Sequence, residues 1–139
     1  MIVLDTNVVS EVLRGPDAEP RVISWLRGLE ARPVTTAITK AELLAGAAVL
    51  PQGARRAALE VGIARVLSPL GVCLPLTDEA AGHYARIVAG RRAAGRPVAG
   101  FDALIAAICR SASATLATRN TSDFEGMGLE LIDPWQAAG

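Results

Sequence analysis

MIVLDTN, residues 1–7, is the stretch from which the fold of this chain can be predicted. Ile2 to Leu4 is an apolar run typical of a short buried strand, and it stops at the carboxylate of Asp5. Ligands of open α/β sheets bind at the carboxyl ends of the strands, which makes Asp5 a candidate site residue. Asp5 could equally be the N-cap of the helix that the apolar residues after it predict, so both interpretations remain open here.

The composition indicates one globular domain, which we assign to residues 1–139. Hydrophobic residues make up 51% of the chain, enough for a single sizeable core. No apolar run approaches the roughly 18 residues that span a bilayer, and no secretory signal precedes the first strand, so we expect a cytoplasmic protein without membrane association. Cys73 and Cys109 lie in apolar segments without metal-ligand spacing, and we expect both to be reduced core residues.

Fourteen basic residues balance fourteen acidic ones, so no overall positive field indicates nucleic-acid binding. Every basic residue except Lys40 is arginine, which can bind phosphates through two hydrogen bonds where it is locally concentrated. The densest cluster is Arg91, Arg92 and Arg96. It could instead be a solvated helix end, where positive charge suits the helix dipole.

Strand and helix signals alternate along the rest of the chain. Apolar runs predict strands over 2–4, 34–38, 72–74, 114–117 and 129–132, and helical periodicity predicts helices over 6–13, 20–29, 39–50, 54–67, 77–94 and 103–112. Such alternation is typical of βαβ units with right-handed crossovers. The prediction is an α/β fold with a mostly parallel, five-stranded sheet and helices on both faces.

Acidic segments fall where strands end and helices begin. Asp5 and residues 118–123 each follow a strand, whereas Glu42 and Asp102 each stand near a helix start, so all four can face one edge of the sheet. Each helix-start acid has a structural alternative. Asp102 would be favoured there by the helix dipole, and Thr39 followed by Glu42 matches a capping box in which Glu42 binds its own helix.

Carboxylates gathered at one edge predict a cation. Two unpaired carboxylates about 4 Å apart repel by roughly 4 kcal/mol at an effective dielectric constant near 20, and capping alone does not explain such a cost. Oxygen ligands without a histidine or cysteine cluster favour Mg²⁺, with Mn²⁺ as an alternative, over zinc. Such ions polarise phosphodiesters and activate water, so the pattern indicates phosphodiester hydrolysis.

Four motifs together resemble the PIN domain of VapC-type toxins, and its FitB-like branch in particular. They are an apolar run with Asp5-Thr6-Asn7, Thr39-x-x-Glu42-Leu43, Pro97 followed by Asp102-Ala103-x-Ile105-Ala106-Ala107, and Thr118-Arg119-Asn120-x-x-Asp123-Phe124. They occur in the expected order, and the resemblance covers essentially the whole chain. It implies a PIN-like domain and a metal-dependent endoribonuclease, the toxin of a type II toxin–antitoxin pair.

The resemblance also implies roles for individual residues. Asp5, Glu42 and Asp102 match the metal-binding acids of the family. Some relatives carry the fourth acid at the position of Asn120, whereas others carry Asn there and Asp three residues later, so we take Asp123 as the fourth acid. The number of metal ions stays open. The supporting polar residues are Thr6, Asn7, Thr118 and Asn120.

Partners follow from the resemblance and from the surface. Candidate contacts to RNA phosphates are Arg91, Arg92, Arg96 and Arg119, although Arg119 could equally pair with one of the acids. The resemblance implies a cognate antitoxin, whose arginine could enter the acidic crevice, and DNA binding only through that antitoxin. Helices 54–67 and 103–112 favour a homodimer if their apolar residues exceed what the sheet covers, or simply cover the sheet.

Three other functions compete with this interpretation. A haloacid-dehalogenase-type phosphohydrolase needs a second acid two residues after the first, where this chain has Asn7. A receiver domain needs a lysine after a late strand, whereas Lys40 lies early in the chain. The remaining alternative is a non-catalytic binding module whose acidic pocket docks an arginine-bearing protein partner.

Overall fold

A computed structural model describes residues 1–137. The predicted domain over residues 1–139 thus includes two residues, 138 and 139, that lie outside the described part. The centre is a parallel sheet of β1 (Ile2–Leu4), β2 (Thr115–Ala117) and β3 (Glu130–Ile132), in the order β1-β2-β3. The register aligns Val3 with Leu116 and Leu116 with Leu131. The α/β class and the parallel arrangement are therefore confirmed.

The prediction of five strands is wrong, because the sheet of residues 1–137 has three. The segment predicted as a strand over 34–38 makes a single parallel bridge, between Val34 and Val3. Two backbone hydrogen bonds join it to β1: Leu4 N–H to the Val34 carbonyl at 2.8 Å, and Val34 N–H to the Ile2 carbonyl at 3.0 Å. The chain then turns into a helix at Ala37, which ends the pairing.

The segment predicted as a strand over 72–74 is likewise reduced to one parallel bridge, between Leu74 and Thr36. Leu74 donates its N–H to the Thr35 carbonyl at 2.9 Å and accepts from Ala37 N–H at 2.9 Å. Pro75 follows and has no N–H to extend the ladder. Both segments lie where the predicted strands would lie, but neither is long enough to form one.

Each predicted helix is present, with both ends within three residues of the predicted bounds. The helices are α1 (Thr6–Leu13), α2 (Pro20–Arg27), α3 (Ala37–Ala48), α4 (Ala54–Leu67), α5 (Asp78–Ala93) and α6 (Gly100–Ser111). Short 3-10 helices are η1 (Gly15–Asp17), η2 (Ser68–Leu70) and η3 (Thr121–Phe124). Within residues 1–137, no helix is both long enough and apolar enough to cross a bilayer.

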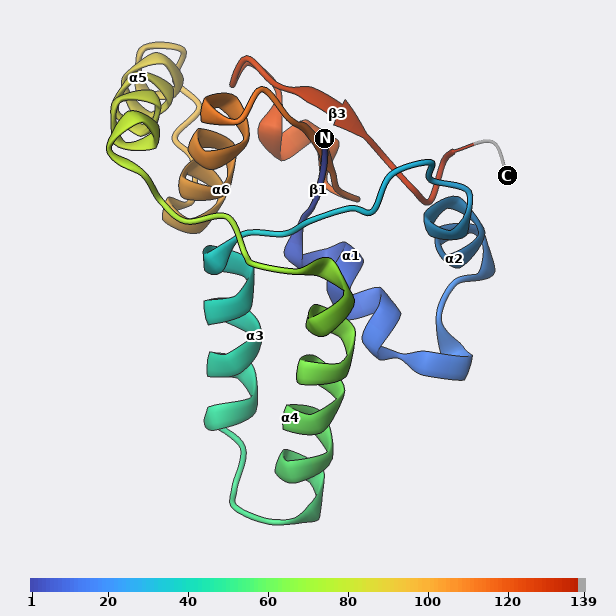
Figure 1. Ribbon diagram of the computed structural model, residues 1–139. Helices are drawn as coiled ribbons and strands as arrows, with labels where there is room; N and C mark the ends of the chain where they lie inside the picture. Colours follow the sequence, from blue (N-terminus) through green and yellow to red (C-terminus); the bar gives the residue numbers. More distant parts are fainter. Residues whose placement is uncertain (138–139) are drawn as a thin grey trace.

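Helices cover both faces of the sheet, as predicted (Figure 1). Val3 and Leu116 pack against α5 and α6 in one buried cluster. Leu4 and Ala117, which point to the opposite face, pack against α1, α2, α3 and α4 in a second cluster. The α3–α4 hairpin extends away from the sheet (Figure 1). The carboxyl ends of β1 and β2 therefore lie between α5 and α6 on one face of the sheet and α1 to α4 on the other.

The structure bears on the surface predictions for two helices and two cysteines. Helix α6 buries most of its apolar residues from Ala103 to Cys109, with Leu104 half-buried, so this stretch mainly covers the sheet, and the dimer stays a prediction. Helix α4 buries Ile63 and Leu67 and leaves Val61 exposed. Cys109 is a buried free thiol, as predicted, whereas the free thiol of Cys73 is only half-buried.

Candidate active site

Asp5 ends β1 and caps α1, so both interpretations of this residue hold at once. Its Oδ1 accepts the Thr6 N–H at 2.8 Å, which is the capping bond, and its Oδ2 accepts the Thr118 hydroxyl at 2.8 Å. The side chain is almost wholly buried, with 5% of the residue exposed. Burial is the main reason that the pKa of Asp5 is raised, and the hydrogen bonds from Thr118 and Thr6 oppose that rise.

Asn7 and Thr118 tie the ends of β1 and β2 together. Asn7 Nδ2 donates to Thr118 Oγ1 at 3.1 Å, and Asn7 Oδ1 accepts the Arg119 N–H at 3.2 Å. Thr118 Oγ1 also accepts the Asn120 N–H at 3.1 Å. The hydroxyl proton of Thr118 is thus directed to Asp5 while both its lone pairs are used, which fixes the orientation of the Asp5 carboxylate.

Glu42 faces the same edge from α3. Its Oε1 accepts the Thr6 hydroxyl at 2.9 Å. The capping-box alternative is wrong, because α3 begins two residues before Thr39 and its N-cap is Thr36, whose hydroxyl accepts the Thr39 N–H at 3.1 Å. Glu42 therefore lies beyond the first turn of its helix, and its carboxylate is available to the site.

Asp102 lies in the first turn of α6 and is half-buried. Burial, the largest cause, and the negative charges of Asp5, Asp123 and Glu42 together raise its pKa to about 6, and the positive charge of Arg91 opposes that rise. These charges act on Asp102, so Asp5, Asp123 and Glu42 each lie within electrostatic range of it. The convergence of all four acids on one metal site stays a prediction.

A cleft of about 410 Å³ opens over these acids. Asp5, Glu42 and Asp102 line it together with Asn120, whereas Asp123 lies outside its lining. Residues that the sequence interpretation missed also line it, and these are Ser10, Glu11, Arg14 and Trp135. Spacings of three, four and seven from Asn7 place Ser10, Glu11 and the C-cap residue Arg14 on one side of α1, so helical periodicity could have identified them.

The donor set suits a hard divalent cation, although no cage is preformed. Within residues 1–137, no three acidic, histidine or cysteine side chains are grouped closely enough to hold a metal ion by themselves. The candidate ligands are all carboxylates, and the mutual repulsion of these carboxylates is what a cation would relieve. Mg²⁺ usually retains several water ligands and binds through one or two carboxylates, which fits acids that converge without touching.

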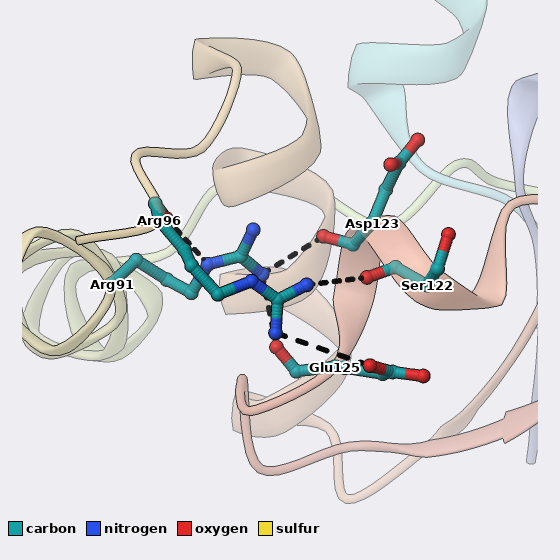
Figure 2. Close-up of polar contacts among 5 residues, drawn as sticks. All are labelled: Arg91, Arg96, Ser122, Asp123 and Glu125. Atoms are coloured by element: carbon teal, nitrogen blue, oxygen red, sulfur yellow. Dashed lines mark hydrogen bonds and ion pairs between the residues drawn. The ribbon is translucent and has the colours of Figure 1, made fainter. Parts of the chain in front are cut away.

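Arg91 has a different position from the one predicted (Figure 2). Only 8% of it is exposed, so it is neither a phosphate contact nor part of a solvated helix end. Its Nε donates to the Arg96 carbonyl at 2.7 Å, and its Nη1 donates to the carbonyls of Asp123 at 3.0 Å and Glu125 at 2.9 Å. We therefore remove Arg91 from the candidate RNA contacts.

The other candidate arginines are exposed. Arg96 donates from Nη2 to the Ser122 carbonyl at 3.3 Å, and Arg92 is exposed at the end of α5. Arg119 lines the cleft and places its guanidinium 5.0 Å from the centre of the Trp135 ring. The alternative that Arg119 pairs with an acid is wrong, since its described partner is an aromatic ring.

The raised pKa values predict how the stability of the metal-free protein depends on pH. The folded chain binds a proton at Asp102 more tightly than the unfolded chain does, so this carboxyl lowers stability as the pH rises from about 4 to about 6. Asp102→Asn should therefore gain stability relative to wild type between about pH 4.5 and pH 7, by about 1 kcal/mol after allowance for solvent screening. Urea unfolding in EDTA at both pH values measures this, and an unchanged difference would contradict it.

The comparisons with known proteins agree with this geometry. Residues 2–128 match the PIN domain. The chain is 38% identical to Toxin FitB of Neisseria gonorrhoeae, over 97% of this chain and 99% of that protein. It is also 38% identical to VapC ribonuclease Y4jK of Sinorhizobium fredii, over 99% of this chain and 100% of that protein.

A solved structure gives the same result. The structure of FitAB bound to the IR36 DNA fragment contains a chain that aligns with this one at a TM-score of 0.88 and 36% identity. The alignment covers 100% of this chain and 99% of that chain. With the family match spanning most of the sequence, the fold and the relatives agree: the chain belongs to the PIN domain family.

Proposed function

We propose that this protein is a metal-dependent endoribonuclease, the toxin of a type II toxin–antitoxin system, which hydrolyses RNA phosphodiester bonds at the acidic cleft. The observation that carries the proposal is that Asp5, Glu42 and Asp102, from three separate elements, line one cleft. The relatives support it, since one is a VapC ribonuclease and another is a toxin. The cytoplasm, where RNA is made and translated, is the proposed location.

The protein groups that would hold Mg²⁺ or Mn²⁺ are the carboxylates of Asp5, Glu42 and Asp102, with Asp123 at the margin. When bound, the ion supplies a Lewis acid that lowers the pKa of water and offsets negative charge on the phosphoryl oxygens. Thr118 and the Thr6 N–H hold the Asp5 carboxylate in one orientation, and the Thr6 hydroxyl holds Glu42. Little reorganisation of these groups is then needed during the reaction.

Arg119 and Trp135 form the edge of the cleft that we propose for RNA contact. A guanidinium stacked over an indole offers a positive charge for phosphate beside a flat surface for a base. Both residues line the cleft with Asp5, Glu42 and Asp102, so a strand held there would lie next to the acids. The exposed Arg92 and Arg96 remain candidates for more distant phosphates.

Trp135→Leu should weaken the binding of single-stranded RNA by about tenfold, because stacking of one base on an aromatic ring is worth about 1–3 kcal/mol. The measurement is fluorescence anisotropy of a labelled oligoribonucleotide with the Asp102→Asn protein, so that cleavage does not interfere. Trp135→Phe is the matched control and should retain most of the affinity. Equal loss in both variants, or none in Trp135→Leu, would remove the stacking contact from the proposal.

A cognate antitoxin is the proposed protein partner. The structure of FitAB bound to a DNA fragment and the similarity to Toxin FitB support an antitoxin for this chain, and we propose that DNA contact occurs only through that antitoxin. An arginine side chain of such a partner would find charge complementarity with Asp5, Glu42 and Asp102. A homodimer remains a proposal as well, and sedimentation equilibrium of the purified chain tests it.

The decisive assay for the function is RNA cleavage with Mn²⁺ or Mg²⁺ and with EDTA. Attack by water yields one hydroxyl end and one phosphate end, without a 2′,3′-cyclic phosphate, and mass spectrometry of the fragments distinguishes these products. Cleavage that survives EDTA, or that yields cyclic phosphate, would overturn the metal-dependent hydrolysis. Absence of both cleavage and Mn²⁺ binding would favour the non-catalytic module that docks an arginine-bearing partner.

A further inference from the structure

A buried arginine lies behind the acidic cleft. Arg91 projects from the last turn of α5 and donates three hydrogen bonds, all to backbone carbonyls. Among the ion pairs of residues 1–137, none involves Arg91. A buried guanidinium without a carboxylate partner is costly, so its hydrogen bonds to the chain must offset a large desolvation cost.

Two of the three carbonyls belong to the segment that carries Asp123. Arg91 Nη1 bridges the carbonyls of Asp123 and Glu125, and Arg96 adds a bond to the carbonyl of Ser122 (Figure 2). In the same view, the carboxylate of Asp123 points away from both arginines. The backbone of Asp123 is therefore held on one side while its side chain remains free on the other.

The segment has few other restraints of its own. η3 is a four-residue 3-10 helix, and two of the bonds that continue it are long: Glu125 N–H to the Ser122 carbonyl and Met127 N–H to the Phe124 carbonyl, each at 3.4 Å. The ring of Phe124 is buried beneath η3 and anchors this short helix to the core. Further restraints come from Arg110, which donates to the Met127 carbonyl at 3.2 Å, and from Arg91, whose Nη1 sets the direction of two carbonyls at once.

We propose that Arg91 is a positioning residue, which orients the Asp123 carboxylate toward the other acids and so sets the affinity of the site for a divalent cation. This inference rests on the proposed function, because it needs a cation site to serve. Its hydrogen bonds to this segment reach only the backbone carbonyls of Asp123 and Glu125, and its positive charge also acts on Asp102, where it opposes the rise of the pKa. A lysine retains the charge but cannot bridge two carbonyls in a fixed plane, so Arg91→Lys separates orientation from charge.

The test uses Arg91→Lys, Asp123→Asn and the double variant, with Arg86→Lys as the matched control on an exposed arginine of the same helix. Calorimetric titration with Mn²⁺ should show about tenfold weaker binding for Arg91→Lys and no change for Arg86→Lys. Asp123→Asn should weaken binding as well, and adding Arg91→Lys to it should cause no further loss. Such non-additivity is what a residue acting through Asp123 requires, whereas a merely structural role would give additive effects.

Amide hydrogen exchange supplies a readout that needs no metal. Arg91→Lys should accelerate exchange at the amides of residues 123–127 by at least about tenfold while the amides of β1 and β2 keep their protection. If Arg91→Lys fails to fold, Arg96→Gln is the second variant, because it removes the exposed bond to the Ser122 carbonyl and the 3.9 Å ion pair with Glu125. It should show a smaller change in the same amides and a smaller loss of Mn²⁺ affinity.

The possible failures are distinguishable. Wild-type protein that binds no Mn²⁺ would overturn the proposed function and, with it, the role of Arg91. Mn²⁺ binding that Asp123→Asn weakens but Arg91→Lys leaves unchanged would overturn the Arg91 assignment alone. Unchanged exchange at residues 123–127 in Arg91→Lys would overturn it equally, and so would additive losses in the double variant.

Discussion

Replacing Asp102 by Asn should reduce kcat/KM for RNA cleavage by at least about 100-fold, which corresponds to about 2.7 kcal/mol of transition-state stabilisation. Asn keeps the size and a hydrogen-bonding oxygen of the side chain but brings no charge to a cation. The negative charges of Asp5, Asp123 and Glu42 all raise the pKa of Asp102, so this acid lies within electrostatic range of the other three. The measurement is initial-rate cleavage of a fluorogenic RNA at saturating Mn²⁺.

Asp78→Asn is the matched control for this prediction. Asp78 lies in the first turn of α5, as Asp102 lies in the first turn of α6, but it is exposed and does not line the cleft. Both changes remove a charge that suits a helix N-terminus, a contribution of about 0.3–1 kcal/mol to stability. Asp78→Asn should cleave RNA like wild type, and full activity of Asp102→Asn would remove Asp102 from the site.

Phe124→Ala should lower the free energy of unfolding by about 3–5 kcal/mol, the largest stability effect that we expect from one substitution. The residue is 1% exposed and packs in the cluster that joins α5, α6 and the sheet. Truncation leaves a cavity beneath η3 in addition to the lost apolar burial. Urea denaturation followed by circular dichroism measures the change.

Phe101→Ala provides the comparison for the same chemical change at the surface. Phe101 is 54% exposed at the start of α6, and its truncation should change the free energy of unfolding by less than about 1 kcal/mol. A loss for Phe124→Ala no larger than that for Phe101→Ala would mean that η3 is not anchored by its ring. The position of Asp123 would then depend on Arg91 and Arg96 alone.

Local sequence patterns were sufficient for most of the fold. Burial of β1 and of α6 could be predicted because each is a run of consecutive apolar residues, Ile2 to Leu4 and the near-continuous apolar stretch of α6. Helix bounds followed from Gly, Pro and polar breaks in the same way. These signals are short-range, so a single sequence contains them.

The number of strands depends on pairing between distant segments, and the prediction of five strands was wrong for that reason. Residues 34–38 are rich in β-branched side chains, but their pairing with β1 stops where Thr36 caps α3. Three threonines, Thr35, Thr36 and Thr39, offer a capping hydroxyl within five residues. The spacing to Glu42 favoured Thr39, whereas the tertiary position of the chain selects Thr36.

The shared cleft of Asp5 and Glu42 could be predicted from the sequence, whereas the positions of the arginines could not. Strand ends and helix starts of a parallel sheet lie at one edge, and both residues line the cleft there. The inward direction of Arg91 depends on carbonyls of residues 123 and 125, which no local pattern reveals. Trp135 likewise reaches the cleft from the far end of the described chain.

The central claim is that the carboxylates of Asp5, Glu42 and Asp102 form one cation site. Calorimetric titration of Mn²⁺ into the wild-type protein and into Asp102→Asn at neutral pH tests it most directly. The expected result is saturable binding by the wild type and at least tenfold weaker binding by Asp102→Asn, which remains folded. Binding of equal affinity in both proteins, or no binding in the wild type, would contradict it.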